Sequence, residues 1–66
     1  APMNRDEIDA AMKRVTISRW MDIDAEIAAG RKLAAIKLLR EATGLGLKDS
    51  KEAVEARMAE RRMTRH

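Results

Sequence analysis

The chain has 66 residues, of which 38% are charged and 2% are aromatic, and its formal net charge is +3. A chain of this length forms one small domain with a core of marginal stability. With no cysteine, one histidine at the last position, and neither tyrosine nor phenylalanine, it lacks the residues for disulfides, for thiolate or histidine metal sites and for an aromatic platform that stacks bases.

The first predicted element is a helix that starts at Asn4. Residues 1–2, which precede the first methionine, are interpreted as a cloning remnant, so one helical domain is expected over residues 3–66. Asn4 can cap this helix, and the carboxylates that follow suit the positive end of the helix dipole. Its apolar side chains recur at helical spacing: Ile8, Ala11, Met12 and Val15.

The segment from Val15 to Trp20 fits two patterns. Its β-branched residues alternate with polar ones, as in a strand, but the chain offers no second strand with which it could pair. We therefore predict that the first helix continues to Arg19 or Trp20 and breaks near Met21. Trp20 is the one aromatic residue and is expected to anchor the core, with a place at a subunit contact as a further option.

A short helix is predicted next, capped by Asp22 or Asp24 and ended by Gly30. A longer helix follows, from about Arg31 to Ala42. Its apolar residues recur at helical spacing: Leu33, Ala35, Ile36, Leu39 and Ala42.

Glycines then mark a turn. Gly44 can take the left-handed conformation that ends a helix, and Gly46 is expected to let the two helices approach closely. Leu45 and Leu47 are expected to fill the crevice between the helices.

The last helix is predicted to start near Lys48, with Ala53, Val54 and Met58 on its apolar side. It ends in a cluster of arginines: Arg57, Arg61, Arg62 and Arg65. Such charge compensates the helix dipole, and it can also form a basic surface for nucleic acid.

The stretch GRKLAAIKLLREATGLGLKDSKEAVE, residues 30–55, resembles the helical hairpin of the C-terminal domain of the bacterial ribosomal stalk protein, the L-seven/L-twelve family. TGLGLK, followed by a lysine three residues later, is the most specific part of the match. In that family a three-stranded sheet covers the helices. Here no strand is found before Gly30 or after Glu55, so we predict an all-α domain of three to four helices that contains the hairpin and has no sheet.

The resemblance also implies a site. In the stalk family the outer face of this hairpin contacts translational GTPases. Matched residue by residue, the partner-binding positions are Lys32, Leu33, Ile36, Lys37, Arg40, Lys48 and Lys51. The alternative is that Leu33 and Ile36 belong to the core and the lysines form a solvated face. Gly44 and Gly46 are structural in either case.

No catalytic constellation is found, and no enzyme activity or cofactor is expected. The turn lacks the G-x-x-x-x-G-K-[ST] pattern of a phosphate-binding loop. Two functions remain: a protein-interaction module acting on the translation machinery through an acidic partner such as a translational GTPase, or a small basic protein that binds nucleic acid or the ribosome. No apolar run is long enough to span a membrane, and a cytoplasmic location is expected.

Self-association, most simply as a homodimer, is also expected. The apolar residues exceed what one small core can bury, and the sheet that covers the hairpin in the stalk family has no counterpart here. A symmetric dimer would cover the surplus.

Overall fold

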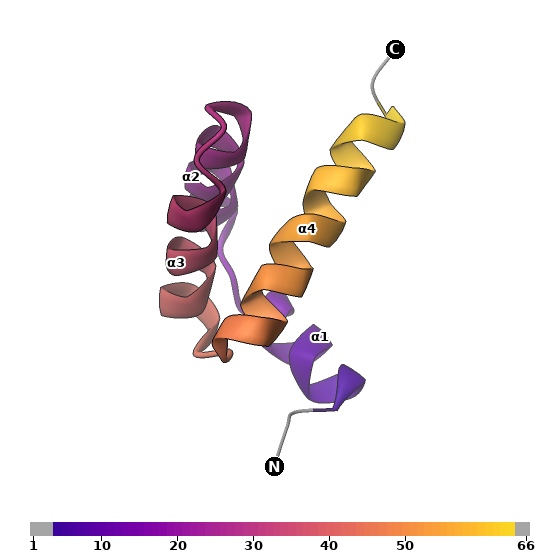
Figure 1. Ribbon diagram of the computed structural model, residues 1–66. Helices are drawn as coiled ribbons and strands as arrows, with labels where there is room; N and C mark the ends of the chain where they lie inside the picture. The colour runs from indigo at the N-terminus through magenta and orange to yellow at the C-terminus, as the bar shows by residue number, and fades with distance from the viewer. Residues whose placement is uncertain (1–3, 65–66) are drawn as a thin grey trace.

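The computed structural model describes the backbone of residues 4–64 and the side chains of residues 4–61. Four helices follow one another along this part of the chain (Figure 1): α1 (Arg5–Lys13), α2 (Ile17–Ala28), α3 (Lys32–Thr43) and α4 (Leu47–Thr64). No strand occurs within residues 4–64, which confirms the predicted all-α fold. The remnant assigned to residues 1–2 lies outside the described residues.

The first helix begins as predicted but ends earlier. The Oδ1 atom of Asn4 accepts a hydrogen bond from the backbone N–H of Glu7 at 2.8 Å, which caps α1. The helix then stops at Lys13, so the prediction of one continuous helix to Arg19 or Trp20 is wrong.

The break lies at Thr16, which caps the next helix. Thr16 has extended backbone angles, and its Oγ1 atom accepts a hydrogen bond from the N–H of Arg19 at 3.1 Å. Because this cap satisfies a backbone donor at the start of α2, Met21 and the two aspartates lie inside the helix. The predictions of a break near Met21 and of a cap at Asp22 or Asp24 are therefore wrong.

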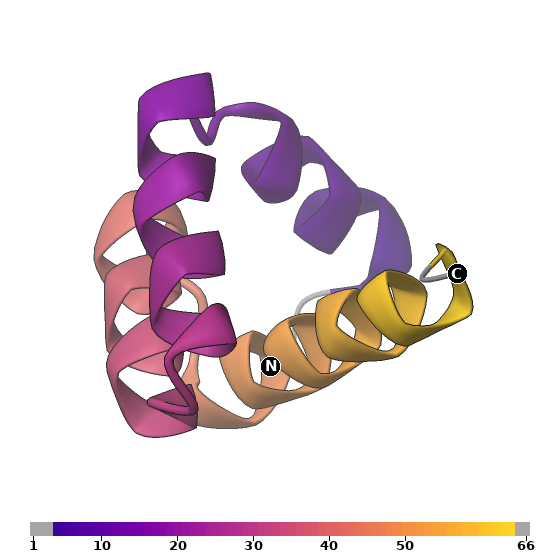
Figure 2. The ribbon, with the colours of Figure 1, turned by 90° about the horizontal axis from the view of Figure 1, so that it is seen from above.

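The helices surround one core. Figure 1 shows α2 and α3 running antiparallel side by side, with α4 leaving the turn after α3 at an angle; Figure 2 shows α1 on the remaining side. The closest helix pairs are α2 with α3 and α3 with α4. The buried cluster between them consists of Val15, Ile23, Ala35, Ile36, Leu39 and Val54. Trp20 is half-buried and packs against this cluster, in agreement with the expected core contact.

The turn between α3 and α4 is built around Gly44. This residue has a φ of +77° and its N–H donates to the carbonyl of Arg40 at 2.7 Å, which is the predicted left-handed helix end. The hydroxyl of Thr43 donates to the carbonyl of Leu39 at 2.7 Å and accepts from the N–H of Leu45 at 3.2 Å. These bonds hold Leu45 in place, and its side chain is 2% exposed.

Two expectations for the turn fail. Leu47 is 58% exposed, so only Leu45 fills the crevice. Gly46 has no positive φ, and no atom lies within 4 Å of the position that a Cβ would take. A close helix approach therefore does not explain the glycine at position 46.

Candidate functional site

One face of α3 is turned away from the core. Leu33, Lys37 and Arg40 are spaced four and three residues apart, so they share a side of the helix. All three are exposed, and Leu33 has 79% of its surface accessible. The face thus consists of an exposed leucine followed by two cations, one and two helical turns further along α3.

Ile36 does not belong to this face. Its side chain is 3% exposed and forms part of the buried cluster with Leu39. The sequence left open whether both residues face a partner or both belong to the core. In the structure Leu33 is at the surface and Ile36 is in the core. The assignment of Ile36 as a partner-binding side chain is corrected, because it has almost no surface to offer.

Lys32 ties α3 to α4. Its Nζ atom donates to Glu55 Oε2 at 2.5 Å, and this hydrogen bond lowers the pKa of the Glu55 carboxyl. Lys32 therefore forms an ion pair within the hairpin. Its charge is therefore already paired with a carboxylate of α4.

The exposed face of α4 continues the site. Lys51 lies one helical turn before Glu55 and contributes to lowering the pKa of that carboxyl. Lys48 and Leu47, one turn earlier on α4, are also exposed. Since Glu55 is bonded to α3, this side of α4 lies beside α3. We call these exposed residues of the two helices the hairpin surface: Leu33, Lys37, Arg40, Leu47, Lys48 and Lys51.

A hollow lies at the end of this surface. It has a volume of about 400 Å³ and is lined by Lys37, Arg40, Glu41, Gly44 and Leu45. Two of the cations of the hairpin surface thus border a shallow, largely open depression.

Leu47 is a site residue that sequence reasoning missed. Helical spacing places it in line with Val54, which is buried, so the sequence pattern contains no signal that sets it apart. Leu47 is the first residue of α4 and is 58% exposed, so no other helix covers it there.

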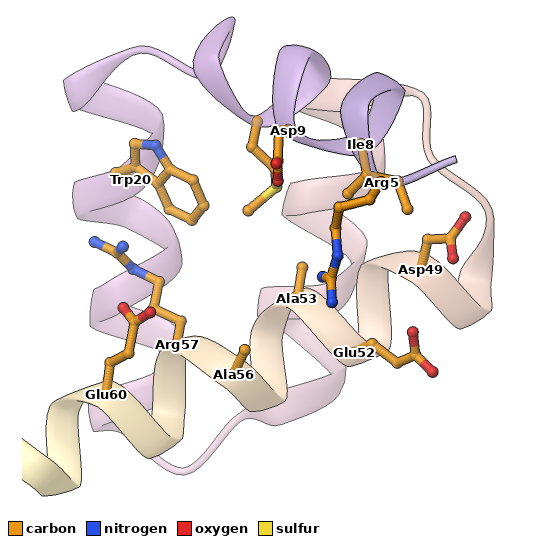
Figure 3. A pocket seen from close by; sticks show the side chains of 11 residues that line it. Arg5, Ile8, Asp9, Trp20, Asp49, Glu52, Ala53, Ala56, Arg57 and Glu60 are labelled. Atoms are coloured by element: carbon orange, nitrogen blue, oxygen red, sulfur yellow. The ribbon is translucent and has the colours of Figure 1, made fainter. Parts of the chain in front are cut away.

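The basic C-terminal helix is less available for nucleic acid than its composition indicates. Arg57 donates to both carboxylate oxygens of Asp24, at 2.5 and 2.8 Å, and its guanidinium lies 4.2 Å from the centre of the Trp20 ring. Figure 3 shows Arg57 beside the indole. The side chains of Arg62 and Arg65 lie outside the described part of the chain. Arg57, one of the proposed basic cluster, therefore forms contacts within the domain.

This ion pair predicts a pH dependence. The hydrogen bond from Arg57 lowers the pKa of Asp24, so the pair stabilises the fold above the unfolded pKa of about 3.9. Its contribution is lost as the pH falls through the lower, folded pKa. We expect Asp24→Asn to lower the free energy of unfolding at pH 7 by about 1 kcal/mol. Between pH 7 and pH 3 the variant should then lose less stability than the unchanged protein does.

Urea denaturation at pH 7 and pH 3 measures this difference. Asp22→Asn, on the exposed side of the same helix, is the control and should follow the unchanged protein at both pH values. Equal losses of stability between pH 7 and pH 3 for Asp24→Asn and the unchanged protein would contradict the assignment.

Two other features are absent from the described part of the chain. Among those residues, no group of three or more His, Cys, Asp or Glu side chains is placed to hold a metal ion. None of the described helices is long and apolar enough to cross a membrane.

Comparison with known proteins places the hairpin in context. The sequence profile of the family described as "Ribosomal protein L7/L12 C-terminal domain" matches residues 22–61. The "Large ribosomal subunit protein bL12" of Aeromonas hydrophila is 45% identical over 47 residues, which is 71% of this chain and 39% of that protein. The chain thus spans well under half of the length of this relative. No solved structure matches this chain.

Proposed function

Because the chain belongs to the ribosomal protein L7/L12 C-terminal domain family, we propose that it is a non-enzymatic protein-interaction module that acts in translation. The hairpin surface is the part that binds the partner. The match over residues 22–61 includes all of α3 and the whole hairpin surface. A cytoplasmic, ribosome-associated location follows from this proposal.

The exposure of Leu33 is the observation that carries the proposal. A large apolar side chain with 79% of its surface accessible gains free energy when a partner removes it from water. Leu47 adds a second such side chain at 58%. The lysines and arginine around them contribute electrostatic attraction, which raises the rate of association with an acidic surface.

The partner is therefore an acidic protein surface with an apolar depression, and a translational GTPase is the candidate that the family resemblance suggests. The hairpin surface includes four cations, Lys37, Arg40, Lys48 and Lys51. None of these four takes part in the three ion pairs found in the described part of the chain, so their charge is available to an acidic partner.

Leu33→Ala and Lys37→Glu test the surface. Truncating a central apolar contact costs more than about 1 kcal/mol at a binding hot spot, so we expect at least a fivefold loss of affinity for a translational GTPase of the same host, on the order of RT ln 5. Lys37→Glu should act mainly on the association rate and should lose its effect at high salt.

Lys13→Glu is the matched control, because Lys13 is an exposed lysine on α1, outside the hairpin surface. Surface plasmon resonance at two salt concentrations gives both rate constants, and circular dichroism checks the fold. Equal affinities for Leu33→Ala and the unchanged protein would remove the basis of the proposal. Binding to a nucleic-acid duplex that Leu33→Ala leaves intact and that falls steeply with salt would instead favour the nucleic-acid alternative.

We further propose that the chain self-associates through α2. One exposed stripe of this helix is apolar along its whole length: Ile17, Met21, Ala25 and Ala28. Ile17 is 81% and Met21 67% exposed. Two copies in antiparallel orientation would place the large residues of one helix against the alanines of the other, which suits a symmetric contact.

Light scattering across micromolar concentrations tests the dimer. We expect a mass above 7.4 kDa for the unchanged protein and a lower mass for Met21→Glu at the same concentration. Asp22→Lys, a substitution next to Met21 on α2, controls for the change of charge. The monomer mass at all concentrations would contradict the proposal.

A further inference from the structure

A second concave site lies on a different part of the molecule from the hairpin surface. It is a pocket of about 270 Å³ between α1 and α4, with Trp20 of α2 at one end (Figure 3). Its apolar lining comes from three helices: Ile8, Met12, Trp20, Ala53 and Ala56. The pocket exists because α1 and α4 are not among the closely packed helix pairs.

The charges around this pocket are mainly negative. Four carboxylates and two arginines line it: Asp9, Asp49, Glu52 and Glu60, with Arg5 and Arg57. Arg57 is held by a further carboxylate, that of Asp24, through two hydrogen bonds. The chain as a whole has a net charge of +3, so this acidic region is opposite in sign to the net charge. Its carboxylates surround the apolar floor of the pocket.

The two sides of α4 differ in charge as a result. Lys48 and Lys51 belong to the hairpin surface, whereas Asp49 and Glu52, the residues that follow them in the chain, line the pocket. Neighbouring residues on a helix point about 100° apart, so the alternation of charge in the sequence becomes two separate faces. One face suits an acidic partner and the other suits a basic one.

We propose that this pocket binds a cationic peptide segment of another protein, with an apolar side chain inserted toward Trp20 and flanking lysines or arginines beside the carboxylates. A pocket of about 270 Å³ has room for one apolar side chain. The carboxylates of α1 and α4 flank the apolar floor from two sides. They can therefore contact the lysines or arginines of the peptide on both sides of its inserted residue. The proposal does not depend on the function of the hairpin surface.

Trp20 provides a direct measurement. It is the only tryptophan, and tyrosine and phenylalanine are absent, so the intrinsic fluorescence of the protein comes from a side chain that lines the pocket. The probe is a short synthetic peptide in which leucines are flanked by lysines. We expect a saturable change in Trp20 emission with this peptide and none with the counterpart in which glutamates replace the lysines.

Two variants of the pocket separate its charge from its shape. Glu52→Lys, at an exposed position of α4, should weaken the lysine peptide by about tenfold or more, and Ala56→Leu should do so by filling the apolar space. Asp22→Lys carries a comparable reversal of charge on α2 outside the pocket and should bind the peptide as the unchanged protein does. Circular dichroism confirms that each variant is folded, and Glu52→Gln replaces Glu52→Lys if the latter is not.

Several results would overturn the proposal. These are equal binding of the lysine and glutamate peptides, no saturable change up to millimolar peptide, or unchanged affinity in both folded pocket variants. A change in Trp20 emission that grows with protein concentration alone, and that persists in Met21→Glu, would show that a second copy occupies the pocket, which also contradicts the proposal. Loss of binding at the hairpin surface does not bear on this result, because Leu33→Ala leaves the pocket intact.

Discussion

Leu39→Ala is expected to lower the free energy of unfolding by about 2–5 kcal/mol. Leu39 is completely buried and belongs to the cluster shared by α2, α3 and α4. A domain of this size has a stability of about 3–5 kcal/mol from its core, so the variant should be largely unfolded at physiological temperature. Few other side chains could be shortened with so large an effect.

Thermal and urea denaturation followed by circular dichroism measure this change. Leu33→Ala is the matched control, because the same substitution at a leucine with 79% of its surface exposed should change stability by less than about 0.5 kcal/mol. A loss below about 1 kcal/mol for Leu39→Ala would show that α2, α3 and α4 do not pack around this residue.

Gly44→Val should destabilise the fold by about 1–3 kcal/mol. The φ of Gly44 is +77°, a conformation that strains a β-branched residue. Nothing lies within 4 Å of the position of a new Cβ, so the cost comes from the backbone and not from a clash. Because the α3–α4 turn joins both halves of the hairpin surface, partner binding should weaken together with stability.

Gly46→Val separates backbone strain from the loss of a glycine. Gly46 lies two residues away, without a positive φ and equally without a neighbour in the way. Valine should therefore be tolerated better at position 46 than at position 44. Equal melting temperatures for the two variants would mean that the left-handed residue does not control the turn.

The charge distribution gives this small domain two distinct surfaces. The hairpin surface is cationic around Leu33 and Leu47, whereas the pocket by Trp20 has carboxylates on both α1 and α4. The Asp24–Arg57 pair lies beside Trp20 and joins α2 to α4. A substitution at Arg57 would thus affect the fold and the pocket together, which makes the exposed carboxylates better test positions.

The break between α1 and α2 shows why the N-terminal half was harder to predict than the hairpin. Apolar residues recur through Val15 and Ile17, so periodicity allows one continuous helix. The bond from the N–H of Arg19 to Thr16 instead starts a new helix at Ile17, and Val15 then turns into the core at 8% exposure. The cap at Thr16 and the burial of Val15 therefore outweighed the apolar periodicity that favours one continuous helix.

The sequence by itself determined the all-α class, the positions of α3 and α4 and the left-handed helix end at Gly44. Helical periodicity and the backbone freedom of glycine depend on residues close in the chain, and the lack of a second strand can be read from the whole sequence. The motif of the stalk family is likewise a run of neighbouring residues, so the order of amino acids is enough to recognise it.

Only the tertiary structure decided which side chains are covered. Leu33 and Ile36 are both apolar and lie three residues apart, yet one is 79% and the other 3% exposed; Leu45 and Leu47 divide in the same way. The ion pair of Arg57 and the pocket between α1 and α4 join residues far apart in the chain. Periodicity defines a face relative to its own helix, but burial depends on which other helix packs there, and that is set by the competition of all four helices for one small core.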